Sequence, residues 1–147
     1  MGLNTASEVI SFAKKLEEEN AKLYEDLAQR YMKGREILLS FAKENRKNIV
    51  QIERTYYEVI TDAIEGCFAF NLNPDEYTFG TELTEKASYS DALCKAIGME
   101  EKIVKFYSDA AEQSKSLMAD VPRAFTIIAK KRDNRRAILK SLLDKAA

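Results

Sequence analysis

Two glutamates and two arginines lie where predicted helices should present apolar side chains to a core. Glu17 and Glu100 each continue a stripe of apolar residues at helical spacing. Arg132 and Arg135 belong to the segment KKRDNRR (residues 130–136), which separates the apolar segments RAFTIIA and AILKSLL. Buried carboxylates and guanidinium groups are tolerated when they pair with each other, so this set of residues predicts a buried ion-pair network.

Each of the four predicted helices carries a polar interruption of this kind. The interruptions are EEEN at 17–20, KENRKN at 43–48, EEK at 100–102 and KKRDNRR at 130–136. Each lies roughly 12 to 16 residues from the turn of its helical hairpin, which is on the order of 20 Å at the rise of an α-helix. The four helices would therefore place these interruptions in one layer, with six inward positions: Glu17, Asn45, Asn48, Glu100, Arg132 and Arg135. The alternative is that each interruption is a solvated stretch on a slightly rotated helix.

Capping signals divide the chain into two helical hairpins. The helix starts are marked by Thr5 with Glu8, Ser88 with Asp91, and Asp120 with Pro122. Gly34 suits the tight turn of the first hairpin. The connection 66–87 between the hairpins is long, contains a turn signal at Asn73-Pro74, and carries aromatic residues that we expect to cover the bundle. The prediction is an all-α, ferritin-like four-helix bundle with a long crossover connection, as a single domain over residues 1–147.

The two hairpins resemble each other in sequence. AKKLEEENAKLYEDLA, which begins at Ala13, aligns with AIGMEEKIVKFYSDAA, which begins at Ala96, with an offset of 83 residues (100 − 17 = 83). Ala, Glu, Glu, Lys, Tyr, Asp and Ala recur at the same places in both segments. Tyr24 and Tyr107 are one such pair, and we expect each to fill the core beside the glutamates with its hydroxyl tied to a neighbour.

Composition excludes several classes of function. The chain has 23 basic and 24 acidic residues among 147, so it lacks the basic excess typical of nucleic-acid-binding proteins. No apolar run is long enough for a membrane span. There is no histidine, the commonest metal ligand and general base. The start of the chain does not resemble a signal peptide, and Cys67 and Cys94 are isolated, which favours the cytoplasm. We expect Cys94 to pack beside the core; the role of Cys67 stays open.

The pattern Ala-x3-Glu-x6-Tyr-x3-Ala in the first and third helices resembles the rubrerythrin-like branch of the ferritin-like superfamily. The resemblance extends over nearly the whole chain. It implies that the first and third helices each supply one glutamate, and the second and fourth each supply a Glu-x-x-His pair, to bind two iron or manganese ions. The activities that it implies are peroxide reduction, iron oxidation and other oxygen chemistry at these metals.

Four of the six ligands implied by this resemblance are replaced. Glu17 and Glu100 match the single glutamates, but Asn45 and Asn48 stand at one Glu-x-x-His pair and Arg132 and Arg135 stand at the other. A guanidinium group does not lose its proton in a protein, so it cannot bind a cation and instead repels one. We therefore expect a metal-free protein without a cofactor or catalytic residues, in which Arg132 and Arg135 pair with the glutamates. We expect a non-enzymatic homodimer that acts through binding or assembly, with a protein or a small anion as its partner.

Two alternatives remain open. A rubrerythrin-type oxidoreductase with an irregular iron or manganese site would be possible if Glu44 turned inward in place of Asn45 and if Glu18 or Glu101 assisted. The chain could instead bind a small anion through the arginine pair and the aromatic residues of the connection.

Overall fold

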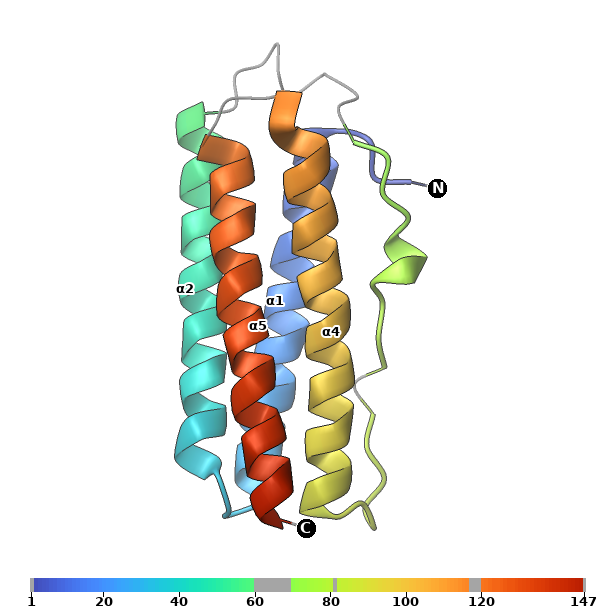
Figure 1. Ribbon diagram of the computed structural model, residues 1–147, viewed down its shortest axis with the longest axis vertical. Coiled ribbons are helices and arrows are strands. Elements are labelled where there is room, and N and C mark those ends of the chain that lie inside the picture. The colour runs from blue at the N-terminus through green and yellow to red at the C-terminus, as the bar shows by residue number, and fades with distance from the viewer. Residues whose placement is uncertain (1, 60–69, 81, 117–119, 147) are drawn as a thin grey trace.

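Four long helices and no strand make up the described part of the chain in the computed structural model (Figure 1). The structure describes residues 2–59, 70–80, 82–116 and 120–146, with backbone only at 56–59, 116 and 120. The helices are α1 (Ala6–Arg30), α2 (Arg35–Val59), α4 (Tyr89–Gln113) and α5 (Asp120–Ala146), with short 3-10 turns η1 (Pro74–Glu76) and η2 (Ser114–Ser116). The predicted all-α class is confirmed. Among the described residues, no helix has the length and apolar character needed to cross a membrane.

Both predicted capping boxes are present. The Thr5 side chain accepts a hydrogen bond from the backbone N–H of Glu8, and the Glu8 carboxylate accepts one from the backbone N–H of Thr5. Ser88 and Asp91 make the same exchange at the start of α4. These contacts satisfy N–H groups that the first turn of a helix leaves unpaired, so they determine where each hairpin begins.

Gly34 forms the turn between α1 and α2, as predicted. Its φ of 68° lies in the left-handed region, where a residue with a side chain is strained. A Cβ atom at this position would also overlap the hydroxyl of Tyr89 at the start of α4. The turn therefore requires glycine for two independent reasons.

We expect Gly34→Ala to lower the free energy of unfolding by about 1–3 kcal/mol, from backbone strain and overlap with Tyr89. Gly98→Ala is the matched control. Gly98 lies inside α4, and a Cβ atom there would have no neighbour within 4 Å, so the second substitution should stabilise the helix by up to about 1 kcal/mol. Urea denaturation of both variants measures the two effects, and the same sign in both would contradict this account of the turn.

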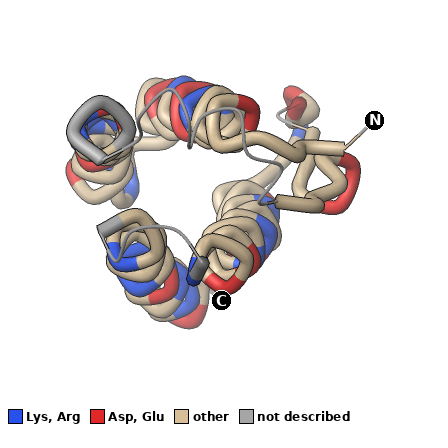
Figure 2. The backbone as a smooth tube through the Cα atoms, turned by 90° about the horizontal axis from the view of Figure 1, so that it is seen from above, with Lys and Arg blue, Asp and Glu red and all other residues tan. Residues whose placement is uncertain are grey.

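The helices pack as two hairpins, α1 with α2 and α4 with α5, and α2 also packs against α5. Figure 1 shows that α2 and α4 run in the same direction. The connecting segment of residues 70–80 and 82–88, which we call the strap, descends along the outside of the bundle beside α1 and α4 (Figures 1 and 2). Leu72 in the strap pairs with Leu3 through backbone hydrogen bonds.

Aromatic residues of the strap cover the side of the bundle, as predicted. Phe70 and Tyr77 are buried, and the ring of Tyr77 packs against Phe12 and Phe106. Arg30 on α1 donates hydrogen bonds to backbone carbonyls of the strap at Leu83 and Thr84. These contacts attach the strap to the bundle along its length. Cys67 and the rest of 66–69 lie outside the described residues.

The buried apolar residues form two clusters rather than one. One cluster contains Leu16 and Ile128, and the other contains Ala21 and Leu139. The segments between them along α1 and α5 include Glu17, Arg132 and Arg135. A polar layer thus separates two apolar halves of the core, at the depth that the sequence interruptions indicate.

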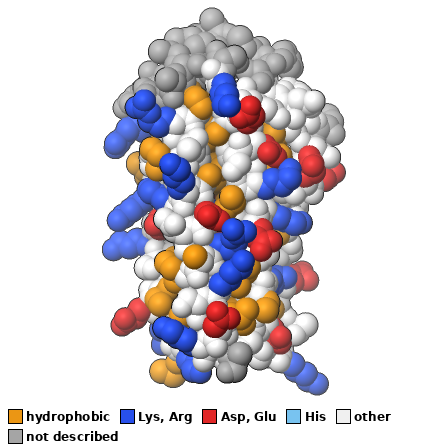
Figure 3. All heavy atoms as spheres, in the orientation of Figure 1, with side chains coloured by type: hydrophobic (Ala, Val, Ile, Leu, Met, Phe, Trp, Pro, Cys, Tyr) orange, Lys and Arg blue, Asp and Glu red, His pale blue; other side chains and the backbone are white. Residues whose placement is uncertain are grey.

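Two apolar residues of the long helices are exposed, and one of them is Cys94, which the sequence analysis places beside the core. Cys94 lies on the solvent side of α4, because it is two positions, about 200° of helix, from the buried Ala96. Ile138 is 43% exposed, since the neighbouring Leu139 takes the inward direction on α5. On the face shown in Figure 3, hydrophobic side chains alternate with charged ones and do not form one continuous patch.

Candidate functional site

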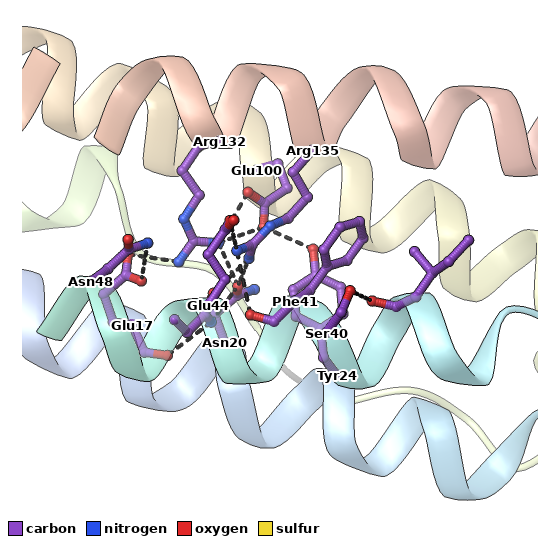
Figure 4. A network of polar contacts seen from close by, with 12 residues as sticks. Glu17, Asn20, Tyr24, Ser40, Phe41, Glu44, Asn48, Glu100, Arg132 and Arg135 are labelled. Carbon is purple, nitrogen blue, oxygen red and sulfur yellow. Dashed lines mark hydrogen bonds and ion pairs between the residues drawn. The ribbon is translucent and has the colours of Figure 1, made fainter. Parts of the chain in front are cut away.

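All six predicted inward side chains are buried in the middle of the bundle. Five of them have no exposed surface and Arg135 has 1%. They come from all four helices and converge on one polar layer (Figure 4). The alternative of solvated stretches on rotated helices is therefore wrong for these positions.

Arg132 lies between the two glutamates. Its Nη2 is 2.6 Å from Oε2 of Glu17 on α1, and its Nη1 is 2.7 Å from Oε2 of Glu100 on α4. A second hydrogen bond of 3.0 Å joins Nη1 to Oε1 of Glu100. The predicted pairing of this arginine with both carboxylates is confirmed, and it ties α5 to α1 and α4 through fully buried charges.

Burial alone lowers the pKa of Arg132, because it disfavours the charged form. The carboxylates of Glu100 and Glu17 oppose this effect, and together with smaller contributions they raise the pKa above its ordinary value. Arg132 is therefore a permanent cation in the folded protein. It cannot serve as a general base or as a metal ligand.

Arg135 makes a different set of contacts. Its Nη1 donates to Oδ1 of Asn45 at 2.6 Å, and its Nη2 donates to Oε1 of Glu44 at 2.6 Å and to the carbonyl of Phe41 at 3.3 Å. Its guanidinium carbon lies 4.7 Å from the centre of the Phe41 ring. The distance to the nearest oxygen of Glu100 is 3.7 Å, so Glu44 is its closest carboxylate partner.

Glu44 joins the layer without the helix shift that the sequence interpretation required. Asn45 remains fully buried, so the register of α2 is the predicted one. The longer Glu44 side chain reaches Arg135 from the edge and keeps 38% of its surface exposed. The other two carboxylates considered for a metal site lie elsewhere, since Glu18 pairs with Arg46 on the surface and Glu101 is exposed. Within the described residues, no group of three or more His, Cys, Asp or Glu side chains is arranged to hold a metal ion.

The two tyrosines connect the hairpins in a reciprocal way. Tyr24 on α1 donates its hydroxyl proton to Glu100 on α4 at 2.8 Å, and Tyr107 on α4 donates to Glu17 on α1 at 2.8 Å. The expectation that their hydroxyls are tied to neighbours is confirmed. Burial, followed by the charge of the bonded glutamate, raises the pKa of both phenols well above the ordinary value. Both tyrosines therefore stay protonated at neutral pH.

Asn20 is a central member of the layer that the sequence analysis missed. Its Oδ1 accepts hydrogen bonds from Nη1 of Arg132 at 2.6 Å and from Nδ2 of Asn45 at 3.0 Å, and it lies 3.4 Å from Nη1 of Arg135. The sequence feature that could have identified it is its spacing of three residues from Glu17, because residues three apart lie on the same face of a helix. The internal repeat concealed this role, because the equivalent position in α4 is the apolar Ile103 (20 + 83 = 103).

Two asparagine amides complete the contacts to Glu17. Asn48 donates through Nδ2 to Oε1 of Glu17 at 3.1 Å, and Asn45 donates through Nδ2 to its backbone carbonyl at 3.1 Å. The four fully buried charges sum to zero, with two carboxylates and two guanidinium groups, and Glu44 adds one negative charge at the edge. Each buried charge of the layer thus has an oppositely charged partner within it.

Comparison with known proteins gives no relative from which to transfer a function, since no family model, curated protein or solved structure matches this chain.

Proposed function

We propose that this chain is a ferritin-like protein of the rubrerythrin-like type in which a glutamate–arginine core replaces a di-metal centre, and that it acts by binding or assembly, not by catalysis. The observation that carries the proposal is the position of Arg132 between Glu17 and Glu100. These are the two glutamates that the family resemblance assigns as single metal ligands, and here both are used by one guanidinium group.

The chemistry of the layer supports this reading. Two divalent cations would require about four carboxylates for charge balance, whereas this layer has two buried carboxylates balanced by two arginines. Asparagine is a neutral and weak ligand with no preference for iron. The parallel direction of α2 and α4 and the long strap further support a ferritin-like crossover (Figure 1).

Metal content tests the proposal. Wild-type protein incubated anaerobically with excess ferrous iron and then desalted should retain no iron. A variant carrying Asn45→Glu, Asn48→His, Arg132→Glu and Arg135→His restores the ligand set of the resemblance and should retain iron. A double variant, Arg132→Gln with Arg135→Gln, is the control, because it removes the opposing charges without adding ligands.

Tightly bound iron in the wild-type protein would overturn the proposal. It would favour the oxidoreductase alternative, for which peroxide reduction is the assay to follow. The small-anion alternative has weaker support, because both guanidinium groups already have carboxylate partners. A homodimer remains a prediction that sedimentation of the purified protein would test.

A further inference from the structure

Helices α2 and α5 together carry an excess of positive charge. They contain 13 basic and 7 acidic residues, a net charge of +6 (13 − 7 = 6), whereas the rest of the chain carries −7 (10 − 17 = −7). Without the buried arginines and glutamates of the polar layer, these charges are +4 (6 − 2 = 4) and −5 (−7 + 2 = −5). Figure 3 shows Lys and Arg side chains along the upper left edge of the molecule, where Figure 1 places α2.

Three lysines lie near the ion pair that joins α2 to α5. The pair of Glu44 and Arg135 sets the level at which the two helices meet, and the helices run in opposite directions (Figure 1). Lys47 lies three residues after Glu44. Lys131 lies four residues before Arg135, so the two lysines are at similar levels, about 4–6 Å along the bundle from the pair. Lys43 precedes Lys47 by one turn, and none of the three lysines has a side-chain hydrogen bond or ion pair with a described residue.

Two partly exposed isoleucines flank Lys131 along α5. Ile127 lies four residues before it and Ile138 seven residues after it, so all three share one side of the helix. The isoleucines are 38% and 43% exposed. We call these two residues and the three lysines the basic face. It combines positive charges that lack partners with apolar side chains that are only partly covered, so it complements an acidic surface that also has apolar residues.

We propose that the basic face binds an acidic amphipathic helix of a partner protein. The inference rests on the proposed binding role and names the surface for it. Since the described residues offer no sheet edge, a bound segment must satisfy its own backbone hydrogen bonds, as a helix does. A helix that lies along α5 has the same rise per residue, so apolar residues eleven positions apart would meet Ile127 and Ile138.

Other occupants fit this face less well. A second copy of the face would place lysines opposite lysines. Among the described residues, α1 and α4 have no exposed large hydrophobic side chain with which a second copy could cover the isoleucines. No described aromatic side chain is exposed, so the face lacks the groups that stack on nucleic-acid bases or anchor a protein at a membrane interface.

Binding of a synthetic peptide to the full chain, followed by fluorescence anisotropy, tests the proposal. The peptide is a helix of about 18 residues, or five turns, with two leucines eleven positions apart and glutamates between them. The wild-type protein should bind it, and replacement of both leucines by serine should weaken binding about tenfold or more. The variant Lys43→Glu, Lys47→Glu, Lys131→Glu should also weaken binding about tenfold or more, because each attraction becomes a repulsion.

A matched variant controls for the overall charge of the protein. Lys15→Glu with Lys22→Glu and Lys95→Glu changes three lysines of α1 and α4, so both triple variants have the same net charge. Its affinity for the peptide should stay within about twofold of the wild type, because charges far from the peptide are screened. Equal losses in the two variants, or no binding to the wild type, would overturn the proposal. So would tighter binding to duplex DNA or to phosphatidylcholine–phosphatidylserine vesicles than to the peptide.

NMR of the wild-type protein gives a second test that does not depend on whether a variant folds. Addition of the peptide to 15N-labelled protein should shift the amide signals of residues 43–47 and 127–138 more than those of α1 and α4. The largest shifts on α1 or α4 would contradict the proposed surface. If the peptide does not bind and the protein retains no iron, only the basic face fails; retained iron overturns the proposed core whatever the peptide does.

Discussion

Arg132→Ala should lower the free energy of unfolding by about 3–5 kcal/mol, the cost of leaving buried charges without their partner. Arg132 provides the only contacts shorter than 3.5 Å between an arginine and either buried glutamate among the described residues. Its removal leaves Glu17 and Glu100 uncompensated in the centre of the bundle, apart from Arg135 at 3.7 Å from Glu100. Because small domains are stable by only about 5–15 kcal/mol, this loss is a large fraction of the total. Urea denaturation followed by circular dichroism measures it.

Two control variants separate the effect of the lost charge on stability from the effect of lost side-chain volume and from any general effect of substitutions in α5. Arg132→Met keeps much of the side-chain volume but not the charge. If uncompensated carboxylates are the cause, it should lower the free energy of unfolding nearly as much as Arg132→Ala does. Arg136→Ala removes a partly exposed arginine that pairs with Asp133 one turn earlier, and exposed pairs contribute at most about 1 kcal/mol. Equal, small losses for Arg132→Ala and Arg136→Ala would contradict the ion-pair account of the core.

Periodicity was sufficient to predict the helices and the depth of the polar layer. The polar interruptions in the four helices coincided in depth because a buried polar residue must find a partner at its own level in the bundle. The strap was harder to predict, since its course depends on where Tyr77 and Phe70 find apolar partners on helices distant in sequence.

The contacts within the layer were only partly predictable. Helical spacing gives the direction of a side chain but not how far it reaches. The Cα–Cβ bond of Glu44 does not point into the bundle, so the sequence analysis placed Asn45 in the layer instead. The Glu44 side chain is nevertheless long enough to reach Arg135 from the edge of the polar layer. Asn20 was overlooked because its counterpart in the repeat is the apolar Ile103. A sequence repeat indicates positions that both hairpins share, and it does not indicate a position that only one hairpin uses. Cys94 was misplaced because a short apolar residue is compatible with either side of a helix.

Alkaline pH should destabilise the protein through Tyr24 and Tyr107. Both phenols have a pKa well above the ordinary value in the folded state, from burial and then from the bonded glutamates, whereas in the unfolded chain they titrate near pH 10. The stabilisation linked to these protons is fully present below about pH 10 and is lost as the pH rises toward the folded-state pKa values, because only the unfolded state releases its protons in that range. The slope contributed by the pair approaches about 2.7 kcal/mol per pH unit, from about 1.4 for each tyrosine.

The double variant Tyr24→Phe with Tyr107→Phe isolates this contribution. It lacks both phenols but keeps every lysine and the buried Tyr77, so all other alkaline titrations are common to the two proteins. At neutral pH the double variant should be the less stable protein, since Glu17 and Glu100 each lose a donor worth about 1.5–3 kcal/mol. Above pH 10 its free energy of unfolding should fall less steeply than that of the wild type, so the stability difference narrows as pH rises. Parallel curves across this range in urea denaturation would mean that the two phenols ionise as readily in the folded protein as in the unfolded chain, which is incompatible with hydroxyls buried against carboxylates.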